Sequence, residues 1–214
     1  MPSLRLAAIA AALVAAAATA GARAAPALSS DDRALVSQAA SYLDGFGELK
    51  GRFLQTDPRG QTTGGVLYLK RPGYARFVYD PPSNVLVVAD GHTVSITDPR
   101  LRTFDRYPLG ATPLALILAK HVRLDRGVEV ISVSHDAEGF TLTARDAAHP
   151  HAGQVTLAFT DHPLRLAAWT MVDAQGRTTR IRLTALEATS GLPASLFVAP
   201  TYYDTRPNVP PPPQ

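Results

Sequence analysis

The stretch Gly64–Asp90 constrains the fold more than any other part of the sequence. It contains three short apolar runs, at Val66–Leu69, Tyr74–Tyr79 and Val85–Ala89. Arg71-Pro72-Gly73 and Pro81-Pro82 separate these runs and predict turns, because proline lacks the N–H of a central strand and glycine accepts a positive φ. Within each run both alternating sets of side chains are apolar, whereas a sheet with one face in water alternates apolar and polar residues. The sequence therefore predicts an antiparallel meander covered on both faces, by protein or by a bound apolar ligand.

The first 24 residues have the organisation of a secretion signal. Arg5 supplies the positive charge, and Leu6–Ala20 is an alanine-rich segment too short and too weakly apolar to span a bilayer. Ala22-Arg23-Ala24 predicts cleavage after Ala24, with Ala20-Gly21-Ala22 as an alternative and a retained anchor as the less favoured reading. We expect an exported, soluble protein of a bacterial periplasm.

Charge and cysteine content exclude several classes of function. The formal charge of +3 falls to +1 once Arg5 and Arg23 leave with the signal, because residues 1–24 contain no acid. No basic cluster with interleaved aromatic residues is present, so nucleic acid is not an expected partner. The chain has no cysteine, so it forms no disulfide and cannot carry lipid on an N-terminal cysteine.

Two helices are predicted. Ser30 is the expected N-cap of the first, with Asp31 and Asp32 in its first turn and an apolar stripe that includes Leu35 and Leu43. Gly45 or Gly47 is expected to end it. The second, Leu114–Ala119, should begin with Thr112 as N-cap and Pro113 at the first helical position. It is apolar all round, so it must be buried or must cover something apolar.

The remaining apolar runs predict further strands, at Leu49–Thr56, Thr93–Thr97, Arg102–Tyr107, Val128–Ser134, Phe140–Ala144, Gln154–Thr160, Leu164–Val172 and Thr178–Glu187. A meander of about ten strands tends to curl. We therefore predict a mainly β (α+β) fold: an open, strongly curved antiparallel barrel with short helices acting as a lid over an apolar cavity. One domain, residues 25–205, is followed by a proline-rich tail, residues 206–214, that is typical of disordered polyproline segments.

Several motifs follow one another in an order that is similar to a known family. They are Gly51-Arg52-Phe53-Leu54-Gln55, Gly65-x-Leu67-x-Leu69-Lys70-Arg71-Pro72-Gly73, Tyr79-Asp80-Pro81-Pro82, Val88-Ala89-Asp90-Gly91, Asp98-Pro99, Thr112–Leu118, Asp173–Thr179 and Phe197-Val198-Ala199-Pro200. In this order and spacing, from about Leu28 to Pro200, the chain resembles the LolA-like periplasmic lipoprotein carriers. The chain departs from well-known members after Pro200, where it becomes proline-rich.

The resemblance implies a periplasmic chaperone rather than an enzyme. Such a carrier takes triacylated lipoproteins from an inner-membrane ATP-binding-cassette release complex, shields their acyl chains and delivers them to an outer-membrane acceptor lipoprotein, where one is present. A monomer without cofactors is expected. Two alternatives stay open: a carrier of another lipid, such as a glycolipid or phospholipid, and a lipoprotein-sensing binding domain of the same fold.

The resemblance also implies site residues. The arginine that matches Arg71 holds the lid helix in the family through hydrogen bonds to its backbone carbonyls, expected here among Leu116–Lys120 and assigned to Leu116 and Ala119. We predict that Arg71→Leu accepts lipoprotein but transfers it poorly. The predicted cavity lining consists of Phe53, Leu67, Leu69, Phe77, Val88, Leu116, Ile117, Val155, Leu157, Trp169 and Ile181.

An enzymatic reading has little support in the sequence. There is no Gly-x-Ser-x-Gly elbow and no thiol nucleophile. His149-Pro150-His151 is the closest histidine pair, and it lacks the spaced partners of a metal site. His135-Asp136 and Asp161-His162 lie at predicted turns, where solvation is the simpler interpretation.

Overall fold

The computed structural model describes residues 28–45, 47–112, 114–122, 124 and 127–200. The predicted signal of residues 1–24 with its cleavage site, the position of Pro113, and the tail of residues 206–214 lie outside the described residues. Within the described part of the chain, no helix is both long and apolar enough to cross a membrane.

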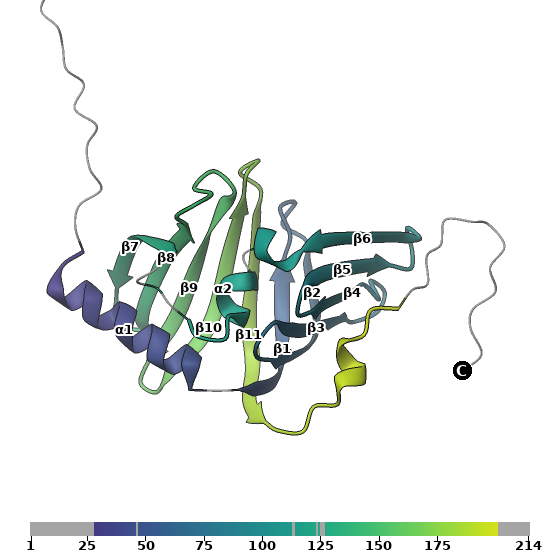
Figure 1. Ribbon diagram of the computed structural model, residues 1–214, viewed down its shortest axis with the longest axis horizontal. Helices are drawn as coiled ribbons and strands as arrows, with labels where there is room; N and C mark the ends of the chain where they lie inside the picture. Colours follow the sequence, from purple (N-terminus) through teal and green to yellow (C-terminus); the bar gives the residue numbers. More distant parts are fainter. Residues whose placement is uncertain (1–27, 46, 113, 123, 125–126, 201–214) are drawn as a thin grey trace, which may run out of the picture.

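The strands form one eleven-stranded antiparallel sheet in the order β6-β5-β4-β3-β2-β1-β11-β10-β9-β8-β7. Their bounds are β1 Glu48–Thr56, β2 Thr62–Lys70, β3 Tyr74–Tyr79, β4 Leu86–Asp90, β5 Thr93–Asp98, β6 Thr103–Pro108, β7 Val128–His135, β8 Gly139–Asp146, β9 Gly153–Asp161, β10 Leu164–Asp173 and β11 Thr178–Thr189. The first and last strands pair at the centre, and β6 and β7 are the two edges. The sheet curves strongly and stays open (Figure 1), which confirms the predicted fold class.

Helix α1, Ser30–Asp44, lies across β7–β10, and the shorter α2, Leu114–Leu118, lies over the middle of the sheet (Figure 1). The N-cap of α1 is Ser29 rather than the predicted Ser30. Ser29 Oγ accepts from the Asp32 N–H at 3.0 Å, and Asp32 Oδ2 accepts from the Ser29 N–H at 3.1 Å. This reciprocal capping box decides between two adjacent serines that are equally good caps alone. Two short 3₁₀ helices, η1 Leu109–Ala111 and η2 Ala194–Phe197, complete the elements within the described residues.

The core lies between the two α-helices and one face of the sheet, which we call the helix face. An aromatic cluster marks its centre: Phe53 packs edge-on against Phe77 and Tyr79, and Phe77 packs edge-on against Trp169, with ring centroids 5.1 to 6.3 Å apart. From α1, Leu43 is fully buried and Tyr42 packs edge-on against Phe159. Burial of apolar surface on this face is the main stabilising contribution to the fold.

The opposite, outer face is covered where β1–β4 pass beneath the segment 190–200. Lys70 Nζ donates to the Leu192 carbonyl at 2.8 Å, and Glu48 accepts from the Leu192 N–H at 2.7 Å. Arg76 donates to the Leu196 carbonyl, and the buried Phe197 packs 5.6 Å from the Tyr74 ring. The two-sided apolar pattern of β2–β4 is thus explained by protein on both faces.

A β-bulge interrupts the alternation of side chains along β11. Strict alternation would place Ile181, Leu183 and Ala185 on one face. In the β1–β11 pairing, Phe53 lies opposite Leu183 while Arg52 lies opposite Ala185, so the register shifts by one residue between them. The extra residue turns Ala185 to the outer face, where it is exposed.

Candidate functional site

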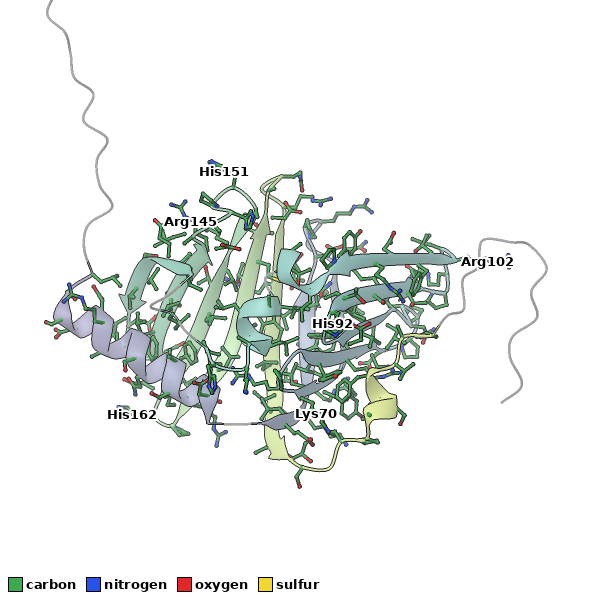
Figure 2. All side chains as sticks on the ribbon, viewed as in Figure 1. Lys70, His92, Arg102, Arg145, His151 and His162 are labelled. Atoms are coloured by element: carbon green, nitrogen blue, oxygen red, sulfur yellow. The ribbon has the colours of Figure 1, made fainter. Side chains whose placement is uncertain are left out.

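A cavity of about 490 Å³ opens between α2 and the ends of β7–β9. Its walls are mostly small or aliphatic, with five polar residues among them: Gly110, Ala111, Thr112, Ala115, Leu116, Gly127, Val128, Ala144, Arg145, Asp146, His149, Ala152, Gly153, Gln154 and Val155. Figure 2 shows Arg145 and His151 at this end of the sheet, near the β8–β9 loop. We call this space the lid cavity. An apolar wall with a few polar groups is the usual character of a small-molecule site.

A second, more open cavity of about 530 Å³ lies at the other side of α2. Its lining consists of Pro72, Gly73, Tyr74, Gly91, His92, Leu109, Gly110, Ala115, Leu118, Ala119 and Lys120. Ala115 and Gly110 line both cavities, so the short helix forms part of the wall between them.

Most of the predicted cavity residues lie in the packed core rather than at the lid cavity. Leu116 and Val155 line it. A further eight are buried with the core of the helix face: Phe53, Leu67, Leu69, Phe77, Ile117, Leu157, Trp169 and Ile181. The buried side chains of α2 therefore occupy the space above this part of the sheet. Contact of these residues with lipid stays a prediction.

The placement of Val88 is wrong. Val88 lies opposite Arg76 of β3 and Ser95 of β5, on the outer face, while its neighbours Val87 and Ala89 share the helix face with Phe77. Val88 is only 1% exposed, and η2 packs against its strand and β3. Both faces of β4 are apolar, so alternation alone does not identify the inner set.

Arg71, directly after β2, connects the C-terminal ends of both α-helices. Its Nε donates to the Ile117 carbonyl at 2.9 Å, and one terminal nitrogen donates to the Leu43 carbonyl. That nitrogen also lies 3.4 Å from Asp44 Oδ1, and the side chain is 6% exposed. The acceptor on α2 is therefore Ile117, not Leu116 or Ala119. Burial lowers the pKa of the guanidinium, and the nearby Asp44 carboxylate opposes this effect.

The Gly73 N–H and the Asp44 carboxylate extend this connection, which we call the helix clasp. The clasp consists of Asp44, Arg71 and Gly73, the carbonyls of Leu43, Ile117 and Leu118, and the N–H of Val122. The Gly73 N–H donates to the Leu118 carbonyl at 2.9 Å. Gly73 has φ +86°, and a Cβ there would lie 2.8 Å from the Gly91 Cα, so only glycine fits. Asp44 Oδ1 accepts the Val122 N–H at 2.8 Å.

Sequence reasoning missed Asp44 and Leu43, although one signal was available. Asp44 is the last residue of α1, where the helix dipole disfavours a carboxylate. An acid at that position indicates a compensating donor from elsewhere in the chain. Arg71 and the Val122 N–H supply it.

The largely apolar helix face also has polar side chains, among them Gln55, Tyr79 and Trp169. The Tyr79 hydroxyl donates to Gln55 Oε1 at 2.6 Å, and burial raises the pKa of Tyr79 to about 12. The Trp169 indole N–H is buried and has no hydrogen-bond partner among the described residues.

The histidines do not gather into a reactive site. His149 Nδ1 lies 3.1 Å from Asp146 at the β8–β9 end, whereas His135 and His162 flank Asp161 at 3.6 and 3.8 Å. Figure 2 places His162 at the end of the sheet opposite Arg145. The described residues contain no group of three or more His, Cys, Asp or Glu side chains that could hold a metal ion.

The model of the family described as "Outer membrane lipoprotein carrier protein LolA" matches residues 44–200. The chain belongs to this family. The match begins at Asp44 and ends at Pro200, so it includes every strand of the sheet, both cavities and all of the helix clasp except the Leu43 carbonyl.

Individual relatives agree with this assignment. An outer-membrane lipoprotein carrier protein of Dechloromonas aromatica is 30% identical over 176 residues, covering 76% of this chain and 81% of the relative. One of Bordetella avium is 31% identical over 186 residues, covering 81% of this chain and 86% of the relative. Among solved structures, a LolA superfamily protein of Nitrosomonas europaea matches with a TM-score of 0.43 at 8% identity, covering 76% of this chain and 97% of that chain.

Proposed function

We propose that this protein is a periplasmic lipoprotein carrier that binds the acyl chains of lipoproteins released from the inner membrane and delivers them to the outer membrane. Nothing is chemically transformed in this task. Each methylene moved from water to an apolar site contributes about 0.8 kcal/mol, so three acyl chains cannot cross an aqueous space unprotected. The name of the family and of its relatives supports the cargo class.

The observation that carries the proposal is the apolar helix α2, placed over the helix face and clasped at its C-terminal end. Leu114, Ile117 and Leu118 of α2 are buried, and its other side chains line the two cavities. If α2 lifts, the acyl chains take the place of its side chains over the sheet. Closing the lid on an empty carrier then offsets part of the binding free energy, which makes release possible.

The finer parts of the proposal concern partners and place. The cargo comes from an inner-membrane ATP-binding-cassette release complex and passes to an outer-membrane acceptor lipoprotein where one exists. Export through the N-terminal signal brings the carrier to the periplasm. The proposed task includes no catalytic step.

Co-expression with a tagged outer-membrane lipoprotein tests the proposal. The protein is produced with its own signal, the soluble carrier is purified from the periplasmic fraction, and the molecules that co-elute are identified by mass spectrometry. We expect triacylated lipoprotein at one molecule per carrier, lost when acylation of the lipoprotein is blocked. Free phospholipid or glycolipid in its place would assign another lipid cargo, and an empty carrier would contradict the proposal.

A further inference from the structure

The lone tryptophan of the chain has a buried donor that the protein leaves without an acceptor. Trp169 is 1% exposed, and its indole Nε1 has no partner among the described residues. Its neighbours on the adjacent strands are Leu157 of β9 and Ile181 of β11, whose side chains contain no acceptor. More than nine in ten buried polar groups find a partner, because an unpaired one costs free energy. The indole N–H is therefore exceptional in this core.

The Trp169 indole N–H belongs to the row of side chains next to the wall of the lid cavity. Val155 of β9 lines the cavity and pairs with Met171 of β10. Leu157 and Trp169 form the next pair on the same face, two residues further from the β8–β9 loop. Two residues along a strand advance about 7 Å, so Trp169 lies one side-chain row deeper than the cavity wall. A ligand that enters through the lid cavity and passes under α2 meets Trp169 at this depth.

We propose that the Trp169 indole N–H donates a hydrogen bond to the carbonyl oxygen of an acyl linkage, ester or amide, when a lipid occupies the lid cavity and the space beneath α2. This inference rests on the proposed carrier function. The hydrocarbon tail of a lipid offers no acceptor, and the carbonyl that joins the tail to its head is the acceptor nearest to it. The carrier would thereby recognise acylated rather than purely alkylated chains, with the linkage near the cavity and the tails deeper in the core.

The test uses three synthetic lipopeptides with the same peptide and chain lengths. The first has two ester-linked chains and one amide-linked chain, the second replaces both esters by ethers, and the third also replaces the amide by an N-alkyl group. Because the chain has one tryptophan, an ¹⁵N-labelled sample gives a single indole ¹H–¹⁵N resonance. We expect this resonance to move downfield with the first lipopeptide and to stay in place with the third. The second separates the two linkages, since it moves the resonance only if the amide is the acceptor.

Variants measure the contribution to affinity. Trp169→3-benzothienylalanine replaces the N–H by sulfur and keeps the shape of the side chain, and Trp169→Phe serves as a second variant. The benzothienyl variant should weaken binding of the first lipopeptide about three- to tenfold and leave binding of the third unchanged, as one neutral hydrogen bond predicts. Trp169→Phe, which also loses packing, should weaken binding of the first more than binding of the third. Ile181→Val, a packing control on the same face, should affect all three lipopeptides alike.

Two results would overturn the inference. One is an indole resonance that stays in place at saturation while backbone resonances of Leu116 and Val155 move. The other is a benzothienyl variant that binds all three lipopeptides as the wild type does. If no resonance anywhere in the protein responds to any lipopeptide, the proposed carrier function fails first and this inference falls with it.

Discussion

The two ends of α2 are held in different ways. At the C-terminal end, Arg71 and Gly73 donate to the carbonyls of Ile117 and Leu118, and Asp44 accepts the Val122 N–H a few residues later. At the N-terminal end, the described hydrogen bonds stay within the local turn, such as Ala115 N–H to the Thr112 carbonyl, and the helix borders the lid cavity. Hydrogen bonds are directional, whereas apolar packing is not. Among the described residues, only the C-terminal end of α2 is thus held by hydrogen bonds from distant parts of the chain.

Breaking the clasped end should have the largest effect. Arg71→Leu leaves the carbonyls of Ile117 and Leu43 buried without their donor, and each such loss costs about 1–3 kcal/mol. We expect unfolding of the empty carrier to become easier by about 2–4 kcal/mol. We also expect lipopeptide to bind at least as tightly but to pass more slowly to acceptor membranes, because closing of the lid no longer offsets binding. Denaturant unfolding and a two-membrane transfer assay measure these effects.

Arg71→Lys is the matched control, since lysine keeps the charge but cannot contact two helix ends with a planar fork. It should lie between wild type and Arg71→Leu in both measurements. Transfer by Arg71→Leu at the wild-type rate would show that the clasp supports the fold only and does not set the position of the lid.

A large side chain in the cavities beside the N-terminal part of α2 should weaken ligand binding and leave the clasp intact. Ala115 is half-buried and lines both cavities, so Ala115→Trp places a large ring where a ligand would enter. We expect lipopeptide affinity to fall about tenfold or more, equivalent to about 1.4 kcal/mol, with little change in thermal stability. Isothermal titration with the triacyl lipopeptide measures the affinity.

Ala119→Trp is the comparison for this substitution, because Ala119 lines only the second cavity. It should bind lipopeptide as the wild type does. Equal losses in both variants would move the binding site away from the lid cavity, and the difference between the two ends of α2 would then concern stability alone.

Local patterns in the sequence predicted nearly all of the fold. Turns marked by proline and glycine separate apolar runs of strand length, and these runs coincide with the eleven strands within a few residues at each end. The two-sided pattern of β2–β4 correctly required cover on both faces. It did not reveal that the segment 190–200 supplies the outer cover through Leu192 and Leu196, because those bonds join residues 120 or more positions apart.

The site was less predictable because it depends on register and on helix ends. Val88 was assigned to the wrong face because both faces of β4 are apolar. The bulge that turns Ala185 to the outer face has no signal in the alternation of β11. Arg71 was found through the family resemblance, but its acceptor on α2 is fixed by where the helix ends, which propensities locate only within one or two residues. Asp44 belongs to the clasp because the fold places the end of α1 beside the β2–β3 turn, and local sequence patterns do not predict that contact.

Ionisation of Tyr79, which lies on the sheet away from the clasp, should have the smallest of these effects on stability. The Tyr79 hydroxyl donates to Gln55 on the helix face, and its pKa is raised from 10.0 to about 12. The folded state therefore holds this proton more firmly than the unfolded state. The contribution of Tyr79 to stability is complete below pH 10 and is lost as the pH rises toward 12, by about 1 kcal/mol at pH 11. Tyr79→Phe should cost about 1 kcal/mol at neutral pH through loss of the hydrogen bond, and should remove this part of the alkaline decline. Urea unfolding of both proteins at pH 7, 9 and 11 measures the difference.

A parallel transfer assay at pH 9 should give equal rates for the two proteins, because the clasp contacts neither Tyr79 nor Gln55. Slower transfer by Tyr79→Phe would mean that the sheet and the clasp are coupled. The position of α2 would then not depend on its C-terminal end alone.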